Sequence, residues 1–196
     1  MSLELDDLSE LRTEFLARGF TYLSTTRANR YLSLGYFQLC DEYDWPFLEA
    51  SNSAVMPQTL TDLGKVESVV NSTNELKILP LDRRIVTDMD PSLNDTGTAE
   101  HYYITASTTI NVYPANTSDT FLVRYWKTPA DLTSDSSTPL VPARWRYLII
   151  EAAVRKAYQD SDNYDLARSA KEEYLDGLTK MLETYAVQQH DRPDEI

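Results

Sequence analysis

The chain has 196 residues, of which 42% are hydrophobic and 25% are charged, values typical of a folded domain and not of a disordered chain. Its 31 acidic and 18 basic residues give a net charge of −13, which argues against tight binding of DNA or RNA, because such binding depends on Lys and Arg. No apolar run approaches the roughly 20 residues needed to cross a bilayer, so we expect no membrane partner. The acidic N-terminus, MSLELDDLSEL, does not resemble a signal peptide, and the lone Cys40 excludes an internal disulfide framework.

Two helices are predicted in the first 45 residues. The second of these two helices begins near Ser24, whose hydroxyl can cap it, and continues towards Tyr43. It must end before Pro46, which lacks an amide hydrogen and disfavours helix in the residue before it. Trp45, Pro46 and Phe47 therefore predict a structural corner fixed by aromatic side chains. The first helix is indicated by apolar residues at helical spacing: Leu5, Leu8, Leu11, Phe15 and Leu16.

The middle of the chain has the texture of β structure. Thr, Val, Ile and Tyr become frequent, and Pro and Asn interrupt the sequence often. Short strands are predicted at residues 63–70, 75–81 and 119–127, with a hairpin at 101–114. Because these strands follow one another closely, we expect a small antiparallel sheet. No phosphate-binding glycine pattern occurs, and the chain has only 5 glycines, so a nucleotide-binding α/β fold is not expected.

Helical periodicity returns after Pro142, which suits the first turn of a helix. An apolar stripe from Trp145 to Ala153 predicts one helix, and a further stripe from Leu166 to Tyr185 predicts the last. We therefore predict an α+β fold: a four-helix bundle of two N-terminal and two C-terminal helices with a central antiparallel β insertion. The expected divisions are an N-terminal helical segment (residues 1–50), a β-rich insertion (residues 51–140), a C-terminal helical segment (residues 141–187) and a flexible tail (residues 188–196).

Two stretches in this order resemble the head-tail connector, or adaptor, proteins of tailed bacteriophages. The first is TTRANRYLSLGYFQLCDEYDWPFLEAS, and the second runs from HYYITASTTINVYP to AYQDSDN, with strands, a Pro and an Ala-rich helix in the family's order. The resemblance covers most of the chain but matches poorly over residues 55–98. The matching positions of the first stretch are Arg27, Asn29, Tyr36, Trp45, Pro46 and Phe47.

The resemblance implies a structural virion protein that needs no cofactor and has no enzymatic activity. Such proteins form a ring, usually of about twelve copies, in the virion neck beneath the portal, and assemble in the host cytoplasm. The lower face of the ring receives a stopper or tail protein. By the same resemblance, the C-terminal tail docks onto the portal: Gln188, Gln189, His190, Asp191, Arg192, Pro193, Asp194, Glu195 and Ile196.

Under this hypothesis the net negative charge of the chain has a function. Acidic groups that face the lumen of a ring would repel the phosphates of DNA, so the duplex could pass without tight binding. The hypothesis predicts that Asp and Glu outnumber Lys and Arg on the lumen surface. Solubility alone is the simpler explanation of the net charge of −13.

Aromatic residues on the predicted strands suggest contact surfaces, since Tyr and Trp bury a large area and keep a polar group. We expect five of them at contacts between subunits: Tyr102, Tyr103, Tyr113, Tyr125 and Trp126. Aromatics on a sheet can also stack against sugars. A carbohydrate-binding accessory module is therefore the alternative function.

The sequence gives little support to catalysis or metal binding. Asp88, Asp90 and Asp95 fail the calcium-loop spacing, because Pro91 follows Asp90 at once and no Glu closes the loop. The two histidines, at positions 101 and 190, have no partner at metal-ligand spacing. Cys40 lies within a predicted helix and is interpreted as a buried structural thiol, so we expect no catalytic and no metal site.

Overall fold

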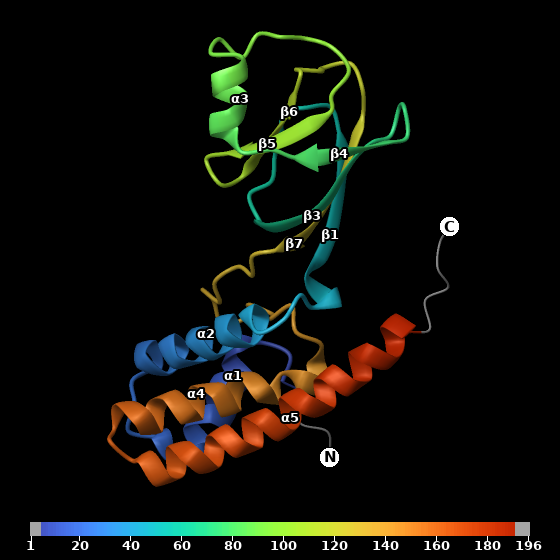
Figure 1. The fold of residues 1–196 in the computed structure, drawn as a ribbon. Coiled ribbons are helices and arrows are strands. Elements are labelled where there is room, and N and C mark those ends of the chain that lie inside the picture. Colours follow the sequence, from blue (N-terminus) through green and yellow to red (C-terminus); the bar gives the residue numbers. More distant parts are fainter. Residues whose placement is uncertain (1–4, 191–196) are drawn as a thin grey trace. The chain divides into compact units, whose positions relative to one another are not determined.

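A computed structural model describes residues 5–190, which divide into two compact units (Figure 1). The helical unit comprises the described residues up to Phe47 and those from Pro129 onward. The β unit is one continuous stretch, Leu48–Thr128.

Helices α1 and α2 begin at side-chain caps, as their sequences predict. The carboxylate of Asp7 accepts a hydrogen bond from the amide of Glu10 at 3.0 Å, and the hydroxyl of Ser24 accepts one from the amide of Arg27 at 3.4 Å. Neither α5, the longest helix, nor any other helix among residues 5–190 is apolar and long enough to cross a membrane. The helical unit contains α1 (Leu8–Phe15), a π-helical turn (Leu16–Phe20), α2 (Thr25–Asp41), the 3-10 turn η3 (Ala143–Trp145), α4 (Tyr147–Asp160) and α5 (Tyr164–His190).

Helix α4 lies at the centre of the helical unit. It packs against α1, α2 and α5, and its side chains are buried on nearly every side, including the run from Leu148 to Val154. Gly35 allows α2 to approach α4 closely, because a Cβ at this position would lie 2.5 Å from the carbonyl oxygen of Ile149. The helices are therefore arranged around a buried central helix.

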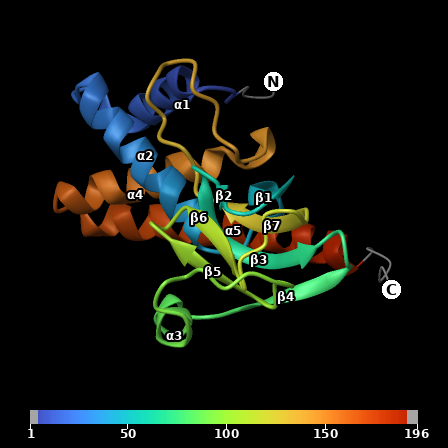
Figure 2. The same cartoon turned by 90° about the horizontal axis from the view of Figure 1, so that it is seen from above.

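The β unit contains a seven-stranded sheet in the order β1-β7-β3-β4-β5-β6-β2 (Figure 2). Most neighbouring strands are antiparallel, but β4 and β5 are parallel, with Leu79 opposite His101. The hairpin of β5 and β6 is confirmed, with Tyr102 opposite Val112. The strands are β1 (Glu49–Ala54), β2 (Gln58–Thr59), β3 (Leu63–Asn71), β4 (Leu76–Pro80), β5 (His101–Thr105), β6 (Thr109–Tyr113) and β7 (Phe121–Lys127).

A buried amide draws the two edges of this sheet together. The side-chain nitrogen of Gln58, on edge strand β2, donates to the carbonyl oxygens of Ala54 at 2.8 Å and Phe121 at 2.9 Å. Its side-chain oxygen accepts a hydrogen bond from the amide of Asn52 at 2.9 Å. Because these partners belong to β1 and β7, at the opposite edge, the sheet curls into a nearly closed, barrel-like shape.

A short helix, α3 (Arg83–Met89), covers a portion of the β unit. Asp82 caps it by accepting a hydrogen bond from the amide of Arg84 at 2.7 Å. Val86 packs with Tyr103 and Tyr113 in a small core of their own. A larger core fills the interior of the sheet and includes Phe121, Val123, Val69 and Ile78 among its fully buried side chains.

The fold class predicted from the sequence is wrong. In place of a four-helix bundle with a small antiparallel insertion, residues 5–190 form five α-helices and a seven-stranded, mixed, nearly closed sheet. The prediction missed α3, β1 and β2. β1 reads EASNSA, which has no apolar alternation, and its pairing with β7 depends on a segment about 70 residues away along the chain. Such pairing is a tertiary event that local periodicity does not record.

Candidate functional site

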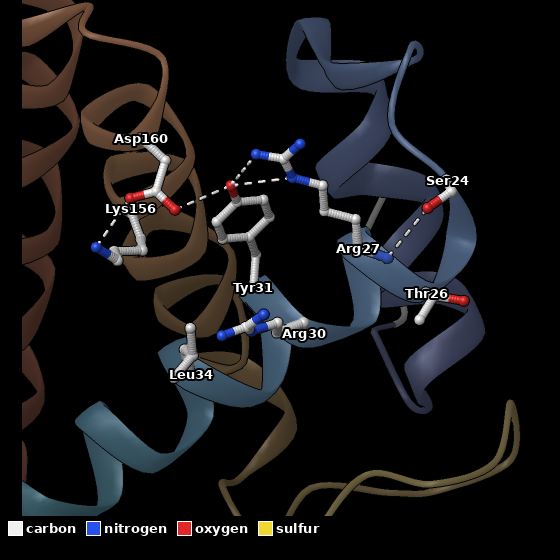
Figure 3. A pocket seen from close by; sticks show the side chains of 8 residues that line it. All are labelled: Ser24, Thr26, Arg27, Arg30, Tyr31, Leu34, Lys156 and Asp160. Atoms are coloured by element: carbon white, nitrogen blue, oxygen red, sulfur yellow. Dashed lines mark hydrogen bonds and ion pairs between the residues drawn. The ribbon is translucent and has the colours of Figure 1, made fainter.

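The helical unit carries an open pocket of about 600 Å³ between the first half of α2 and the end of α4 (Figure 3). Three of the side chains that line it are basic and one is acidic, which gives a net of two positive charges in a chain of net charge −13. We call it the basic pocket. It is lined by Ser24, Thr26, Arg27, Arg30, Tyr31, Leu34, Lys156 and Asp160.

A hydrogen-bond network crosses the pocket from one helix to the other. The guanidinium of Arg27 donates from Nε and Nη2 to the hydroxyl oxygen of Tyr31, at 3.4 and 3.3 Å. Tyr31 in turn donates to Oδ2 of Asp160 at 3.1 Å, and Lys156 Nζ lies 2.9 Å from Oδ1 of the same carboxylate. The hydrogen bond from Lys156 lowers the pKa of Asp160. The carboxylate is therefore charged near neutral pH, and it holds Tyr31 and Lys156 in place.

Arg30 differs from Arg27 and Lys156 in its polar contacts. It is exposed, and it forms no ion pair or hydrogen bond with the segment of the chain that the structure describes. It lies three residues after Arg27, so both side chains project from one side of α2. Beside them Leu34 is 44% exposed, which adds an apolar surface to the pocket. This combination suits an anionic group that also carries an apolar side chain.

The predicted corner is present at the end of α2. The helix stops at Asp41, and Trp45 is 1% exposed, with its indole nitrogen donating to the carbonyl oxygen of Leu39 at 2.7 Å. Its ring stacks on Phe47 and meets Tyr185 of α5 edge-on, with centroid distances of 5.7 Å in both cases. The aromatic corner therefore joins the end of α2 to the last helix.

A family model described as the SU10 adaptor protein matches residues 6–195, nearly the whole chain. The chain belongs to the SU10 adaptor protein family. This confirms the resemblance to phage head-tail adaptors. The protein is thus a structural, adaptor-type component of a bacteriophage virion, and adaptors of this kind interact with portal and tail components. No curated protein matches the sequence.

The adaptor buries most of the aromatic side chains that were predicted at contacts between subunits. Tyr102 and Tyr125 belong to the core of the sheet, and Tyr103 and Tyr113 pack under α3. Trp126 is half-buried, with Lys65 Nζ 5.0 Å from the centre of its ring. Their role between subunits stays a prediction. The four tyrosines do not form an exposed platform of the kind that stacks sugars.

The predicted docking tail of the adaptor begins within α5. This helix continues to His190, so the backbone of Gln188, Gln189 and His190 is helical. The remaining predicted residues, 191–196, lie outside the described residues. The docking role of the whole segment stays a prediction.

Several side chains considered for other chemistry have structural contacts. The carboxylate of Asp90 accepts hydrogen bonds from the amides of Ser92 at 3.2 Å and Asp95 at 2.9 Å, so it shapes its own loop. Asp95 accepts a hydrogen bond from the hydroxyl of Tyr113. Cys40 is buried, and burial raises the pKa of its thiol to about 12. Within residues 5–190, no group of three or more His, Cys, Asp and Glu side chains could hold a metal ion.

The basic pocket is a site that the sequence did not predict. Arg27 appeared only as a matching position of the family resemblance. The sequence offers only a weak signal, two arginines three residues apart on one helix, because arginines lie even closer at positions 83 and 84 and at positions 144 and 146. Lys156 and Asp160 could not have been assigned to the same site, since the sequence separates them from Arg30 by more than 120 positions.

Proposed function

We propose that this adaptor joins the portal to the stopper or tail of the virion as a ring of identical copies, with DNA passing through its lumen. The observation that carries the proposal is the family match over residues 6–195, which includes both the helical unit and the β unit. A ring of about twelve copies beneath the portal is the arrangement that the family resemblance implies.

The net charge supports a passage for DNA that does not hold it. Each copy contributes a net charge of −13, so a ring of about twelve carries a large negative charge around its axis. Carboxylates on the lumen repel phosphates, and the duplex meets few of the cations that would bind it. Lumen surfaces should therefore carry more Asp and Glu than Lys and Arg.

Docking through the C-terminal segment 188–196 fits this arrangement. A segment of nine residues offers only a small contact area, so each single contact is weak. Repetition of that contact around a ring compensates for this, because many weak contacts act together. Attachment of the assembled ring can then be firm even where one copy binds weakly.

Electron microscopy of portal-containing capsids, with and without the purified adaptor, tests the proposed function. We expect added density directly beneath the portal, and averaging should give its rotational symmetry. A capsid lacking the adaptor provides the control. Density that is absent, or that lies elsewhere on the capsid, contradicts the proposal.

Removal of residues 188–196 tests the docking segment separately. The shortened chain should keep the circular dichroism spectrum of the full chain and lose attachment to capsids. A chain of full length with the order of these nine residues scrambled is the matched control for length and charge. Undiminished attachment of the shortened chain would refute the assignment.

A further inference from the structure

We propose that the basic pocket of one copy receives the acidic end of α2 from a neighbouring copy. The acidic end is the segment Asp41, Glu42, Tyr43 and Asp44, which follows directly on the helix and is exposed throughout. The inference rests on the proposed function, because it assigns the contact by which identical adaptors assemble.

The charges of α2 oppose the dipole of the helix. The N-terminus of a helix carries partial positive charge and its C-terminus partial negative charge. Helix α2 has the unfavourable arrangement at both ends, with Arg27 in the first turn and Asp41 as the last residue. Its first turn contains no acidic residue, and its last turn contains no basic one. Arg27 is held by its hydrogen bonds to Tyr31, but Asp41 at the last residue gains nothing from the helix dipole, which points to a role for it outside the chain.

Two of the charges also lack partners among the residues that the structure describes. Arg30 and Asp41 are exposed, and neither forms an ion pair or hydrogen bond within residues 5–190. The single acidic side chain of the pocket, Asp160, is engaged by Lys156 and Tyr31 and so does not neutralise Arg30. Arg30 therefore gives the pocket positive charge, and Asp41 gives the acidic end negative charge, that no side chain among residues 5–190 pairs with.

The apolar portions of the two surfaces match as well. Leu34 is 44% exposed in the pocket, and Tyr43 is 47% exposed in the acidic end. An aromatic side chain flanked by carboxylates can contact Leu34 while the carboxylates meet the arginines, as buried aromatic anchors with charged neighbours do at interfaces. A DNA phosphate has no such apolar portion, and the carboxylate of Asp160 would face it.

The placement of the two surfaces allows contacts that repeat from copy to copy. The pocket lies along the first half of α2, whereas the acidic end follows the last turn, where the chain leaves the helix for the aromatic corner. Such surfaces can meet in a two-fold pair, in which both contacts form at once, or in a head-to-tail contact, which leaves one pocket and one acidic end free on each pair. The head-to-tail contact is the one that fits the proposed ring. A further copy can join at either side, and closure yields a ring.

Disulfide trapping tests this contact without a portal. Two variants of the full chain, Arg30→Cys and Glu42→Cys, each with Cys40 replaced by Ala so that one cysteine remains, are mixed and oxidised, and the mixed disulfide is counted by mass against the two homodimers. We expect the mixed species to exceed its statistical share several-fold. The matched control pairs Arg30→Cys with Leu175→Cys, an exposed position on α5 outside both surfaces. A mixed 30–42 disulfide at the statistical share overturns the proposal.

A chain that carries both cysteines distinguishes a ring contact from a two-fold dimer. The head-to-tail contact gives a ladder of covalent oligomers on a non-reducing gel. A product that stops at the dimer, with both disulfides formed, overturns the head-to-tail arrangement.

Charge reversal supplies a second readout. Arg30→Glu and Asp41→Lys should each weaken self-association roughly tenfold, measured by sedimentation velocity over a range of protein concentrations, because each places like charges opposite one another. The chain with both substitutions should recover, since the pair is restored with reversed sign. Arg30→Glu places a negative charge in the N-terminal half of α2, and Asp41→Lys places a positive charge at its C-terminus. Both changes are favourable with respect to the helix dipole, so the melting temperature should not fall. Failure of the double variant to recover contradicts the proposed pairing.

These outcomes are separate from those of the capsid experiment. Capsid attachment without the 30–42 disulfide preference removes only the contact proposed between copies. The disulfide preference without density beneath the portal removes only the proposed place in the virion.

Discussion

In the helical unit a single buried helix, α4, supports the others, whereas in the β unit the core lies inside a curled sheet that no single strand dominates. The two units also differ in how the chain forms them. The helical unit combines residues from both ends of the sequence, and the β unit is the continuous stretch Leu48–Thr128. Long-range contact thus assembles the helical unit from helices that are individually recognisable. In the β unit most strands are also recognisable, but β1 and β2 are defined only by long-range pairing.

Buried polar groups connect distant segments in both units. In the helical unit, Arg146 donates to the carbonyl oxygens of Leu5 at 3.0 Å and Val141 at 2.8 Å, which ties the N-terminal segment to the entry of α4. In the β unit, Gln58 performs the corresponding task between the sheet edges. A buried donor that loses such partners costs about 1–3 kcal/mol, so each group specifies one arrangement of its unit.

The largest expected effect is that of Phe121→Ala in the core of the sheet. Phe121 is fully buried, and its loss leaves a cavity that should cost about 4 kcal/mol of unfolding free energy. If the two units unfold separately, hydrogen exchange will rise within residues 48–128 and stay unchanged in α4. Leu79→Ala, at a position that is 54% exposed, is the control and should cost less than about 0.5 kcal/mol. Equal loss of protection in both units would show that they unfold together.

Gly35→Ala should have the next largest effect, about 3 kcal/mol, because the added methyl group would press against the backbone of α4. Chemical denaturation monitored by circular dichroism gives the change. Gly97→Ala in the β unit is matched in chemistry, but its Cβ would lie 3.8 Å from Pro114, an ordinary contact. That control should be close to neutral, and an equally unstable Gly97→Ala would remove close helix packing as the explanation.

Alkaline pH should weaken the helical unit through two buried groups of α2. Burial raises the pKa of Cys40 from 9.0 to about 12 and that of Tyr36 from 10.0 to about 12. The folded state therefore keeps protons that the unfolded state releases, so the contribution of these two groups to stability is constant below about pH 9 and falls between pH 9 and 12. The fall is at most about 1.4 kcal/mol per pH unit for each group. In urea unfolding at pH 8 to 11, Cys40→Ala should reduce the loss between pH 9 and 10. An unchanged slope would contradict the role of the thiol.

Loss of a helix cap should have the smallest effect. Asp7→Ala removes the acceptor of the Glu10 amide and should cost about 1 kcal/mol, while Asp7→Asn retains an acceptor and most of the stability. The equivalent pair at Asp82, which caps α3, compares the two units directly. Thermal unfolding of the four variants would show whether the loss of a cap lowers stability by the same amount in both units. An equal loss of stability in the Ala and Asn variants would exclude capping as the cause.

The sequence by itself determined the four α-helices of the helical unit, the hairpin from His101 to Tyr113, strand β7 and the aromatic corner, because each of these depends on neighbouring residues. Only the tertiary structure decided the number of strands, the parallel pairing of β4 with β5, the central position of α4 and the joining of Arg30 with Lys156 in one pocket. The physical reason is that periodicity records which side of an element is apolar. It does not record which distant segment will cover that side.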